Sequence, residues 1–157
     1  MAPAHPAKAV RFLGDAAEAP AVRGAYLLLV SLPAPLSVVL PGRVAVELQP
    51  GRFLYAGSAR GPGGLRARLM RHQRAGKTLH WHIDRLTEAG EVQGAWILPG
   101  GDECAIVAAL PHLPVPLPGF GSSDCRCCVS HLLGWPDGAG DVAAVLTKAG
   151  LGRCEAV

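Results

Sequence analysis

Three apolar segments of the chain have the length and spacing of buried strands. Residues 24 to 31 form a compact apolar run, and residues 52 to 58 form a second run that stops at the glycine-rich stretch from 61 to 64. Residues 92 to 98 supply a third run around Trp96. The pattern therefore predicts three core strands that are far apart in the sequence.

A shorter alternating pattern lies between the first two predicted strands. Residues 38 to 40 and 43 to 48 flank the turn pair Pro41-Gly42, and Val44 and Val46 alternate with polar neighbours. This pattern predicts an added hairpin with one buried face.

Helical spacing begins after the glycine-rich stretch. From Gly64 to Ala75, Leu65 and Leu69 stand one helical turn apart, basic residues cover much of the remaining surface, and Gly76 ends the helix. A second, short helix is predicted from Asp102 to Leu110, with acidic residues in the first turn where the helix dipole favours them.

The length of 157 residues fits one domain, which we place at residues 23 to 137. Residues 1 to 22 are rich in alanine and proline without periodicity, which predicts a flexible N-terminal arm. Residues 138 to 157 are expected to be a C-terminal tail with one weak helix that contributes packing only. The longest apolar run, Ala25 to Val30, is too short for a membrane span, and we expect a cytoplasmic protein with no membrane association.

The positive charge of the chain is concentrated in one segment. Between Arg52 and Ile83 there are seven Lys or Arg, three His and no Asp or Glu. Such a segment is typical of a phosphate-binding face, and the alternative is a solvated helix surface. The residues expected to contact nucleic acid are Arg60, Arg66, Arg71, Arg74, Lys77, His80 and His82.

Two clusters have candidate metal-binding residue types. If residues 80 to 84 are extended, His80, His82 and Asp84 project to one side and could bind metal or phosphate; the alternative is a pair of buried, hydrogen-bonding histidines.

The cysteines form the other cluster. They are five in number, which suits reduced thiols better than a disulfide framework. Cys125, Cys127 and His131, with Cys128 as a spare, could form a zinc site, but their spacing is not that of common zinc modules. We therefore expect reduced cysteines lining a loop, without structural zinc.

Two tripeptides stand at the ends of predicted strands. Gly24-Ala25-Tyr26 opens the first strand, and Tyr55-Ala56-Gly57 closes the second; a helix with Arg68 and His72, a strand, and a helix that begins with Glu103 then follow. This order resembles the GIY-YIG nuclease superfamily over most of the domain, and in particular a small stand-alone branch described as domain of unknown function 123.

The resemblance implies an α+β fold, with a GIY-YIG-like three-stranded antiparallel sheet flanked by helices and, here, an inserted β-hairpin. It implies that Tyr26, Tyr55, Arg68 and Glu103 surround one divalent cation, Mg²⁺ or Mn²⁺, which Glu103 holds, with Asp102 as the rival ligand. His72 would then be placed to accept a proton, although the sequence leaves the identity of the general base open.

The implied activity is endonucleolytic hydrolysis of nucleic-acid phosphodiesters, with DNA as the expected substrate. The alternative is a nucleic-acid-binding module that keeps the fold and does not cleave.

Overall fold

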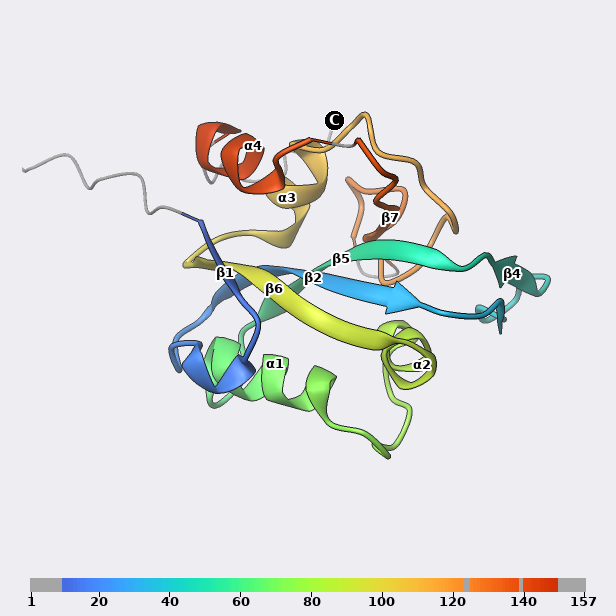
Figure 1. Ribbon diagram of the computed structural model, residues 1–157, viewed down its shortest axis with the longest axis horizontal. Coiled ribbons are helices and arrows are strands. Elements are labelled where there is room, and N and C mark those ends of the chain that lie inside the picture. Colours follow the sequence, from blue (N-terminus) through green and yellow to red (C-terminus); the bar gives the residue numbers. More distant parts are fainter. Residues whose placement is uncertain (1–9, 123–124, 139, 150–157) are drawn as a thin grey trace, which may run out of the picture.

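The computed structural model describes residues 10–122, 125–138 and 140–149. This part of the chain is an α+β domain in which helices cover both faces of a five-stranded antiparallel sheet (Figure 1). The strand order is β1-β6-β2-β5-β7. The strands are β1 (Arg11–Leu13), β6 (Glu91–Pro99), β2 (Gly24–Leu32), β5 (Gly51–Ala59) and β7 (Leu132–Gly134).

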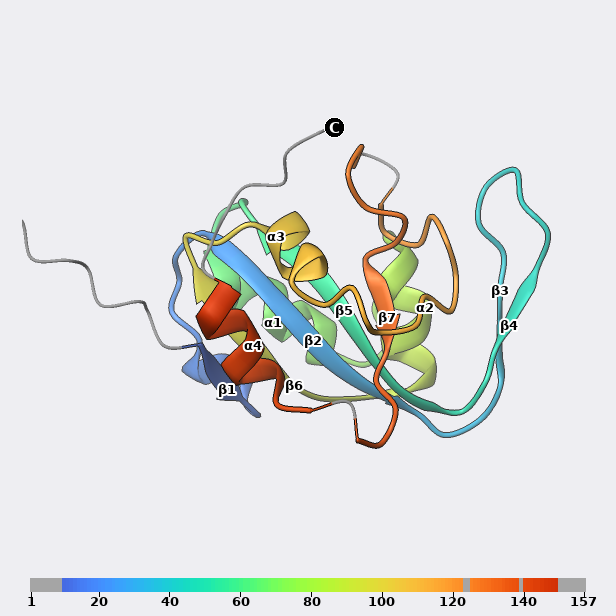
Figure 2. The same ribbon diagram turned by 90° about the horizontal axis from the view of Figure 1, so that it is seen from above.

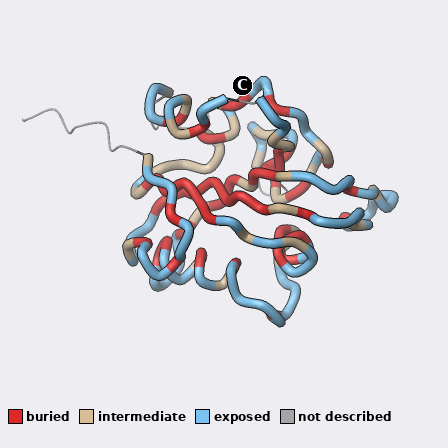
Figure 3. Tube along the Cα trace, in the orientation of Figure 1, coloured by how far each residue is buried: buried red, intermediate tan, exposed pale blue. Residues whose placement is uncertain are grey.

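The central strand, β2, is buried on both faces. Leu28 and Val30 belong to the core on one side of the sheet, whereas Leu27 and Leu29 belong to the core on the other side. Because both faces exclude water, β2 carries a continuous apolar run and not an alternation of apolar and polar residues. Figure 3 shows that buried positions follow the central strands through the middle of the molecule.

The helices form two outer layers (Figure 1). On one face lie the 3₁₀ helix η1 (Ala16–Glu18) and the α-helices α1 (Gly64–Gln73) and α2 (His82–Ala89). On the other face lie α3 (Glu103–Ala108) and α4 (Val142–Ala149). Among the described residues, no helix has both the length and the apolar character that crossing a bilayer requires.

The three predicted core strands are β2, β5 and β6, and the prediction that they form an antiparallel sheet is confirmed. The sheet is larger than expected, because β1 pairs with β6 and β7 pairs with β5 at its two edges. Strands of three residues carry too little periodic signal to be found by pattern alone.

The predicted flexible arm is wrong for residues 10 to 22. Leu13 pairs with Ala95 across the β1–β6 ladder, and Ala16 and Ala19 are buried in the core. The helix η1 contacts α1, and the Ala16 amide donates a 3.0 Å hydrogen bond to the Gln73 side chain. Residues 1 to 9 lie outside the described part of the chain.

The predicted C-terminal tail is likewise part of the domain. Val142 and Leu146 of α4 are buried in the same core as Ile106 of α3, so the helix packs as predicted but inside the folded unit. Residues 150 to 157 are outside the described residues.

The predicted hairpin is confirmed, with its first strand two residues nearer the N-terminus and its second strand shorter than expected. β3 (Leu36–Val38) pairs with β4 (Val46–Leu48) in a separate two-stranded sheet. It extends from the sheet where β2 ends and β5 begins (Figure 2). The insertion therefore lies at the opposite end of β2 from Tyr26 and leaves the pairing around that residue intact.

Candidate active site

Antiparallel pairing gathers four elements at one end of the sheet. Gly24 at the start of β2 pairs with Ala59 at the end of β5 and with Pro99 at the end of β6. Since α1 follows β5 and α3 follows β6 along the chain, both helices begin near this end. Residues separated by almost 80 positions in sequence, such as Tyr26 and Glu103, are thereby brought to one site.

A cleft of about 460 Å³ opens at this end of the sheet. The structure places all five residues of the predicted catalytic set in its lining: Tyr26, Tyr55, Arg68, His72 and Glu103. They come from β2, β5, α1 and α3.

Tyr26 and His72 form a buried pair in the cleft. The Tyr26 hydroxyl lies 2.6 Å from Nε2 of His72, and each residue is 1% exposed. Burial raises the pKa of Tyr26 well above its usual value, and the neighbouring Tyr55 adds to the effect. Burial, followed by the positive charge of Arg68, lowers the pKa of His72 to about 3. Both side chains are therefore neutral at pH 7 and are joined by one hydrogen bond.

A glycine on the neighbouring strand makes room for the Tyr26 ring. Gly57 is the register partner of Tyr26, and a Cβ atom on Gly57 would overlap the tyrosine ring. Tyr55 lies two residues before Gly57 and so points to the same face of the sheet as Tyr26. The tripeptide Tyr55-Ala56-Gly57 thus supplies both a second tyrosine and the space for the first.

Tyr55 lies between charges of opposite sign. Burial raises the pKa of Tyr55, the negative charge of Glu103 raises it further, and Arg68 opposes the increase. On its other side the ring packs against Gly121, whose φ of +68° and close approach to the tyrosine both favour glycine. Tyr55 is therefore fixed between the sheet and the loop that contains Gly121.

Glu103 is the first residue of α3, and its half-buried side chain lines the cleft. Asp102, the rival ligand, is the N-cap of the same helix, and its Oδ1 accepts a hydrogen bond of 3.0 Å from the Cys104 amide. Capping of this kind satisfies an amide that the helix leaves unpaired. The two adjacent acids thus differ: Asp102 caps the helix, whereas the Glu103 carboxylate makes no hydrogen bond or ion pair with the other described residues.

Arg68 is held in the cleft by an aromatic residue that we did not select from sequence. Its guanidinium lies 4.1 Å from the ring centre of Trp81, at a distance typical of a cation–π contact. The histidines of the string from His80 to Asp84 were the predicted ligands, but Trp81 and Ile83 are the members of that string that line the cleft.

Arg71 was predicted to bind nucleic acid, but its guanidinium is already engaged by other side chains of the domain. Its two terminal nitrogens donate to the carboxylate of Asp84 at 2.6 and 2.9 Å, and its guanidinium lies 4.2 Å from the Trp81 ring centre. Asp84 is completely buried and also accepts from the amides of His80 and Trp81. Burial alone would raise the pKa of Asp84, but these hydrogen bonds hold it at about 2.

Residues 80 to 84 are not extended, because α2 begins at His82. The hypothesis of one metal-binding face formed by His80, His82 and Asp84 is therefore wrong. Nδ1 of His82 accepts a 2.9 Å hydrogen bond from the Gly121 amide, so this histidine fixes the loop beside Tyr55. His80 is exposed and its ring packs against Trp81.

Lys77 is the clearest error among the predicted phosphate contacts. Its ammonium donates to the carbonyls of His72 and Arg74 at 3.2 and 3.0 Å and lies 3.3 Å from the Glu88 carboxylate. A lysine bonded to the last carbonyls of a helix satisfies groups that would otherwise be unpaired. Because its side chain is 1% exposed, Lys77 cannot reach a phosphate on the surface.

The remaining basic residues divide between cleft and surface. Arg60 lines the cleft, and so does Arg126, which the sequence analysis did not select. Arg66 and Arg74 are exposed on α1 outside the cleft lining, and Arg66 also donates through Nε to the Ala19 carbonyl. Arg126 carries no periodic or motif signal, because it lies within the cysteine-rich segment.

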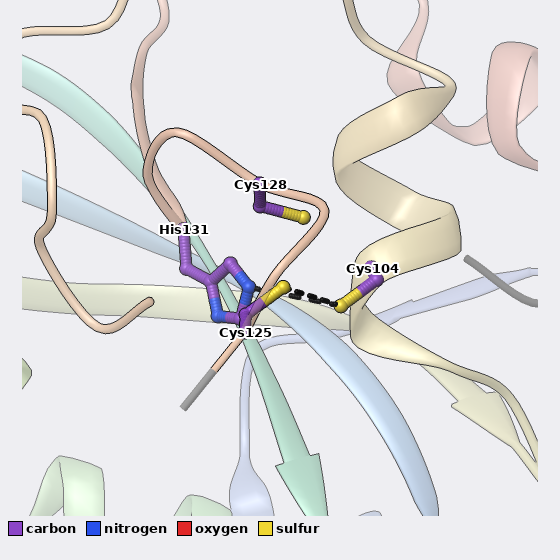
Figure 4. A group of neighbouring side chains, drawn as sticks. All are labelled: Cys104, Cys125, Cys128 and His131. Carbon is purple, nitrogen blue, oxygen red and sulfur yellow. Dashed lines mark hydrogen bonds between the residues drawn. The ribbon is translucent and has the colours of Figure 1, made fainter. Parts of the chain in front are cut away.

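A cysteine–histidine cluster adjoins the same cleft. The metal-binding atoms of its four members all lie within 4.8 Å of one another (Figure 4). The members are Cys104, Cys125, Cys128 and His131. The structure thus has a group of residues that could hold a metal ion, and it differs from the set expected from spacing because Cys104 joins it and Cys127 does not. Cys127 is disulfide-bonded, so the expectation of reduced cysteines is wrong for this residue.

Burial affects the cluster's ionisation. It raises the pKa of the Cys104 thiol and raises that of Cys128 to about 11. Burial would raise the pKa of Cys125 too, but hydrogen bonds from the Cys104 thiol and from the amides of Cys127 and Cys128 lower it. Burial also lowers the pKa of His131, which favours a neutral imidazole.

Comparison with known proteins gives one match. Neither the curated proteins nor the solved structures give a significant match to this chain. A family model described as domain of unknown function DUF123 matches residues 25–150, a range that contains the whole cleft lining and the cysteine–histidine cluster. The chain belongs to the DUF123 family.

Proposed function

We propose that this protein is a metal-dependent nuclease of the GIY-YIG type, which hydrolyses phosphodiester bonds in nucleic acid and, as we expect, in DNA. The observation that carries the proposal is the presence of two tyrosines, an arginine, a histidine and a glutamate in one cleft of about 460 Å³. These residue types are the ones that phosphodiester hydrolysis uses to orient water, accept a proton and stabilise charge.

The charges of the cleft suit a phosphodiester. Arg60, Arg68 and Arg126 supply three positive groups to its lining. A guanidinium donates two parallel hydrogen bonds to phosphate oxygens, and Arg68 is oriented for this by its contact with Trp81. We assign to Arg68 the stabilisation of charge that develops on the non-bridging oxygens.

Glu103 fits a hard divalent cation. Mg²⁺ and Mn²⁺ prefer oxygen ligands, and Mg²⁺ commonly keeps several waters while it binds one or two carboxylates and the substrate phosphate. Glu103 offers such a carboxylate at the edge of the cleft, beside an Asp102 that is engaged as a helix cap. When bound, the cation would supply positive charge to the phosphate oxygens.

The Tyr26–His72 pair suits the activation of water. In our proposal the Tyr26 hydroxyl orients the attacking water, whose oxygen forms the new bond to phosphorus while the bond to the leaving oxygen breaks. His72 is neutral and holds the Tyr26 hydroxyl through their 2.6 Å contact; because its pKa is about 3 it is a weak base, so we assign to it the positioning of Tyr26 and of the water, whose proton passes to solvent while the leaving oxygen takes one up from solvent. Tyr55 holds the opposite wall of the site through its contact with Gly121.

The test is incubation of the full chain with labelled single-stranded, duplex and branched DNA and with RNA, in Mg²⁺, in Mn²⁺ and in chelator. We expect cleavage that requires the metal and that collapses in Glu103→Gln, which removes a charge at nearly constant volume. Glu91→Gln, at an exposed position of β6, is the matched control and should cleave normally.

Two outcomes would oppose the proposal. Cleavage by Glu103→Gln at the wild-type rate would show that the metal is not held there. Binding of nucleic acid without cleavage, with every substrate and both metals, would favour the non-cleaving module.

A further inference from the structure

The four side chains of the cysteine–histidine cluster have the mutual spacing of a tetrahedral metal site. Zinc binds thiolate sulfur at about 2.3 Å and imidazole nitrogen at about 2.0 Å, which places neighbouring ligand atoms about 3.5 to 3.8 Å apart. Sγ of Cys104 lies 3.9 Å from Nε2 of His131 and 3.1 Å from Sγ of Cys125, and all four ligand atoms lie within 4.8 Å of one another. No separation exceeds the tetrahedral value by more than about 1 Å, so small side-chain movements would complete the tetrahedron.

The local chain path prepares these groups to bind a cation. Cys125, Cys128 and His131 are spaced at intervals of three residues within one short segment, and the thiols of Cys104, Cys125 and Cys128 are not disulfide-bonded. Figure 4 shows that the three sulfurs and the imidazole converge on a common point between α3 and the neighbouring loop.

We propose that Cys104, Cys125, Cys128 and His131 bind one zinc ion. Three thiolates and one imidazole form a ligand set that suits zinc and does not suit Mg²⁺ or Ca²⁺, which prefer oxygen. Four protein ligands fill the tetrahedron, so the ion is structural and leaves no open position for substrate.

The position of the cluster shows which elements a bound zinc would join. Cys104 directly follows Glu103 on α3, whereas His131 precedes β7, and its carbonyl accepts a 2.9 Å hydrogen bond from the Ala56 amide of β5. A metal shared by these residues joins α3 to β5, the strand that carries Tyr55. The zinc therefore fixes the wall of the cleft on which Glu103 stands. Its binding does not depend on whether the cleft cleaves nucleic acid.

The test is the metal content of the full chain, unfolded and reduced, then refolded with a small excess of Zn²⁺ and dialysed in reducing buffer. We expect about one zinc per chain, the stoichiometry of a four-ligand site. Cys128→Ser should lower the content at least severalfold. Val129→Ser is the matched control, because this exposed neighbour is outside the cluster, and it should retain the zinc.

Titration of the wild-type chain with Co²⁺ keeps the test decisive if Cys128→Ser fails to fold. A tetrahedral site with three thiolates should give strong visible bands and a sulfur-to-cobalt charge-transfer band, and Zn²⁺ should displace both. Zinc well below one per chain, a cobalt spectrum without the charge-transfer band, or full retention of zinc by a folded Cys128→Ser would overturn the assignment. None of these measurements uses a nucleic-acid substrate, so their outcome is separate from that of the nuclease assay.

Discussion

The hydroxyl of Tyr26 lies 2.6 Å from Nε2 of His72, and both side chains are almost completely excluded from solvent. In water the pKa of tyrosine lies above pH 7 and that of histidine lies below it. Burial moves both pKa values further from pH 7, so both side chains are neutral. Burial is the main cause of the low pKa of His72; the positive charges of Arg68, Lys77 and Arg71 lower this pKa further, and the negative charge of Asp84 raises it.

The first prediction concerns the pH dependence of stability. The pKa of His72 is about 3 in the folded chain and near 6.5 when unfolded, so the unfolded state binds more protons between these values. Neutral His72 therefore makes its full contribution to the free energy of unfolding above pH 6.5, and this contribution is lost as the pH falls toward 3. Between those values the free energy of unfolding should fall more steeply in wild type than in His72→Gln, by up to about 1.4 kcal/mol per pH unit.

Urea unfolding of both proteins from pH 7.5 to 4 measures this difference. His80→Gln, at an exposed histidine, is the control and should follow the wild-type curve. Parallel curves for wild type and His72→Gln would contradict the buried, neutral state of His72.

The second prediction concerns Gly57, whose Cβ position is occupied by the Tyr26 ring. Gly57→Ala should destabilise the domain by about 1 to 3 kcal/mol, the cost of overpacking a filled site, and should displace Tyr26 from His72. Cleavage should be lost together with stability. Gly61→Ala provides the comparison, since nothing lies within 4 Å of a Cβ atom there, and its melting temperature should be unchanged. A stable and active Gly57→Ala would show that the tyrosine position is not critical.

The central strands and the two tyrosines could be predicted because their signals are local. The apolar run of β2 follows from strand periodicity, and the tyrosines stand in two local tripeptides, Gly24-Ala25-Tyr26 and Tyr55-Ala56-Gly57. Glu103 could be placed at the start of α3 for the same reason, since an acidic first turn after Pro99-Gly100-Gly101 is a local signal.

The incorrect predictions concern residues whose contacts are distant in sequence or whose local structure is irregular. Lys77 reads as one of a row of surface charges, yet it folds back on the end of α1, and only the three-dimensional path shows this. Cys104 is 21 residues from Cys125, so no spacing rule joins it to the cysteine-rich segment. β1 lies in an alanine- and proline-rich stretch where three residues of strand have no detectable period.

The third prediction follows from the contact between Arg71 and Asp84. Arg71→Ala would leave a completely buried carboxylate without its main partner, at a cost of the order of 3 kcal/mol in the free energy of unfolding. Arg74→Ala, at an exposed position three residues later, should leave stability unchanged. It should instead weaken binding to nucleic acid and reduce the salt dependence by about one counterion, because Arg74 is free to contact phosphate. Equal melting temperatures for the two variants would contradict the structural role of Arg71.

The last prediction concerns Arg68, which lies in the cleft against Trp81. Arg68→Ala should lower turnover of bound substrate by on the order of hundredfold or more, as is typical when one preorganised donor to the transition state is removed. Arg68→Lys keeps the positive charge but loses the planar pair of donors and the stacking on Trp81, so it should restore binding better than turnover.

Single-turnover cleavage at saturating protein separates these two effects. Arg85→Ala, at an exposed arginine of α2 outside the cleft lining, is the matched control and should cleave at the wild-type rate. If Arg68→Lys recovers full turnover, charge alone is sufficient, and the bidentate contact that we assign to Arg68 is not part of the mechanism. If Arg68→Ala cleaves as wild type does, Arg68 has no part in the chemical step and the cleft must stabilise the phosphate through Arg60 or Arg126 instead.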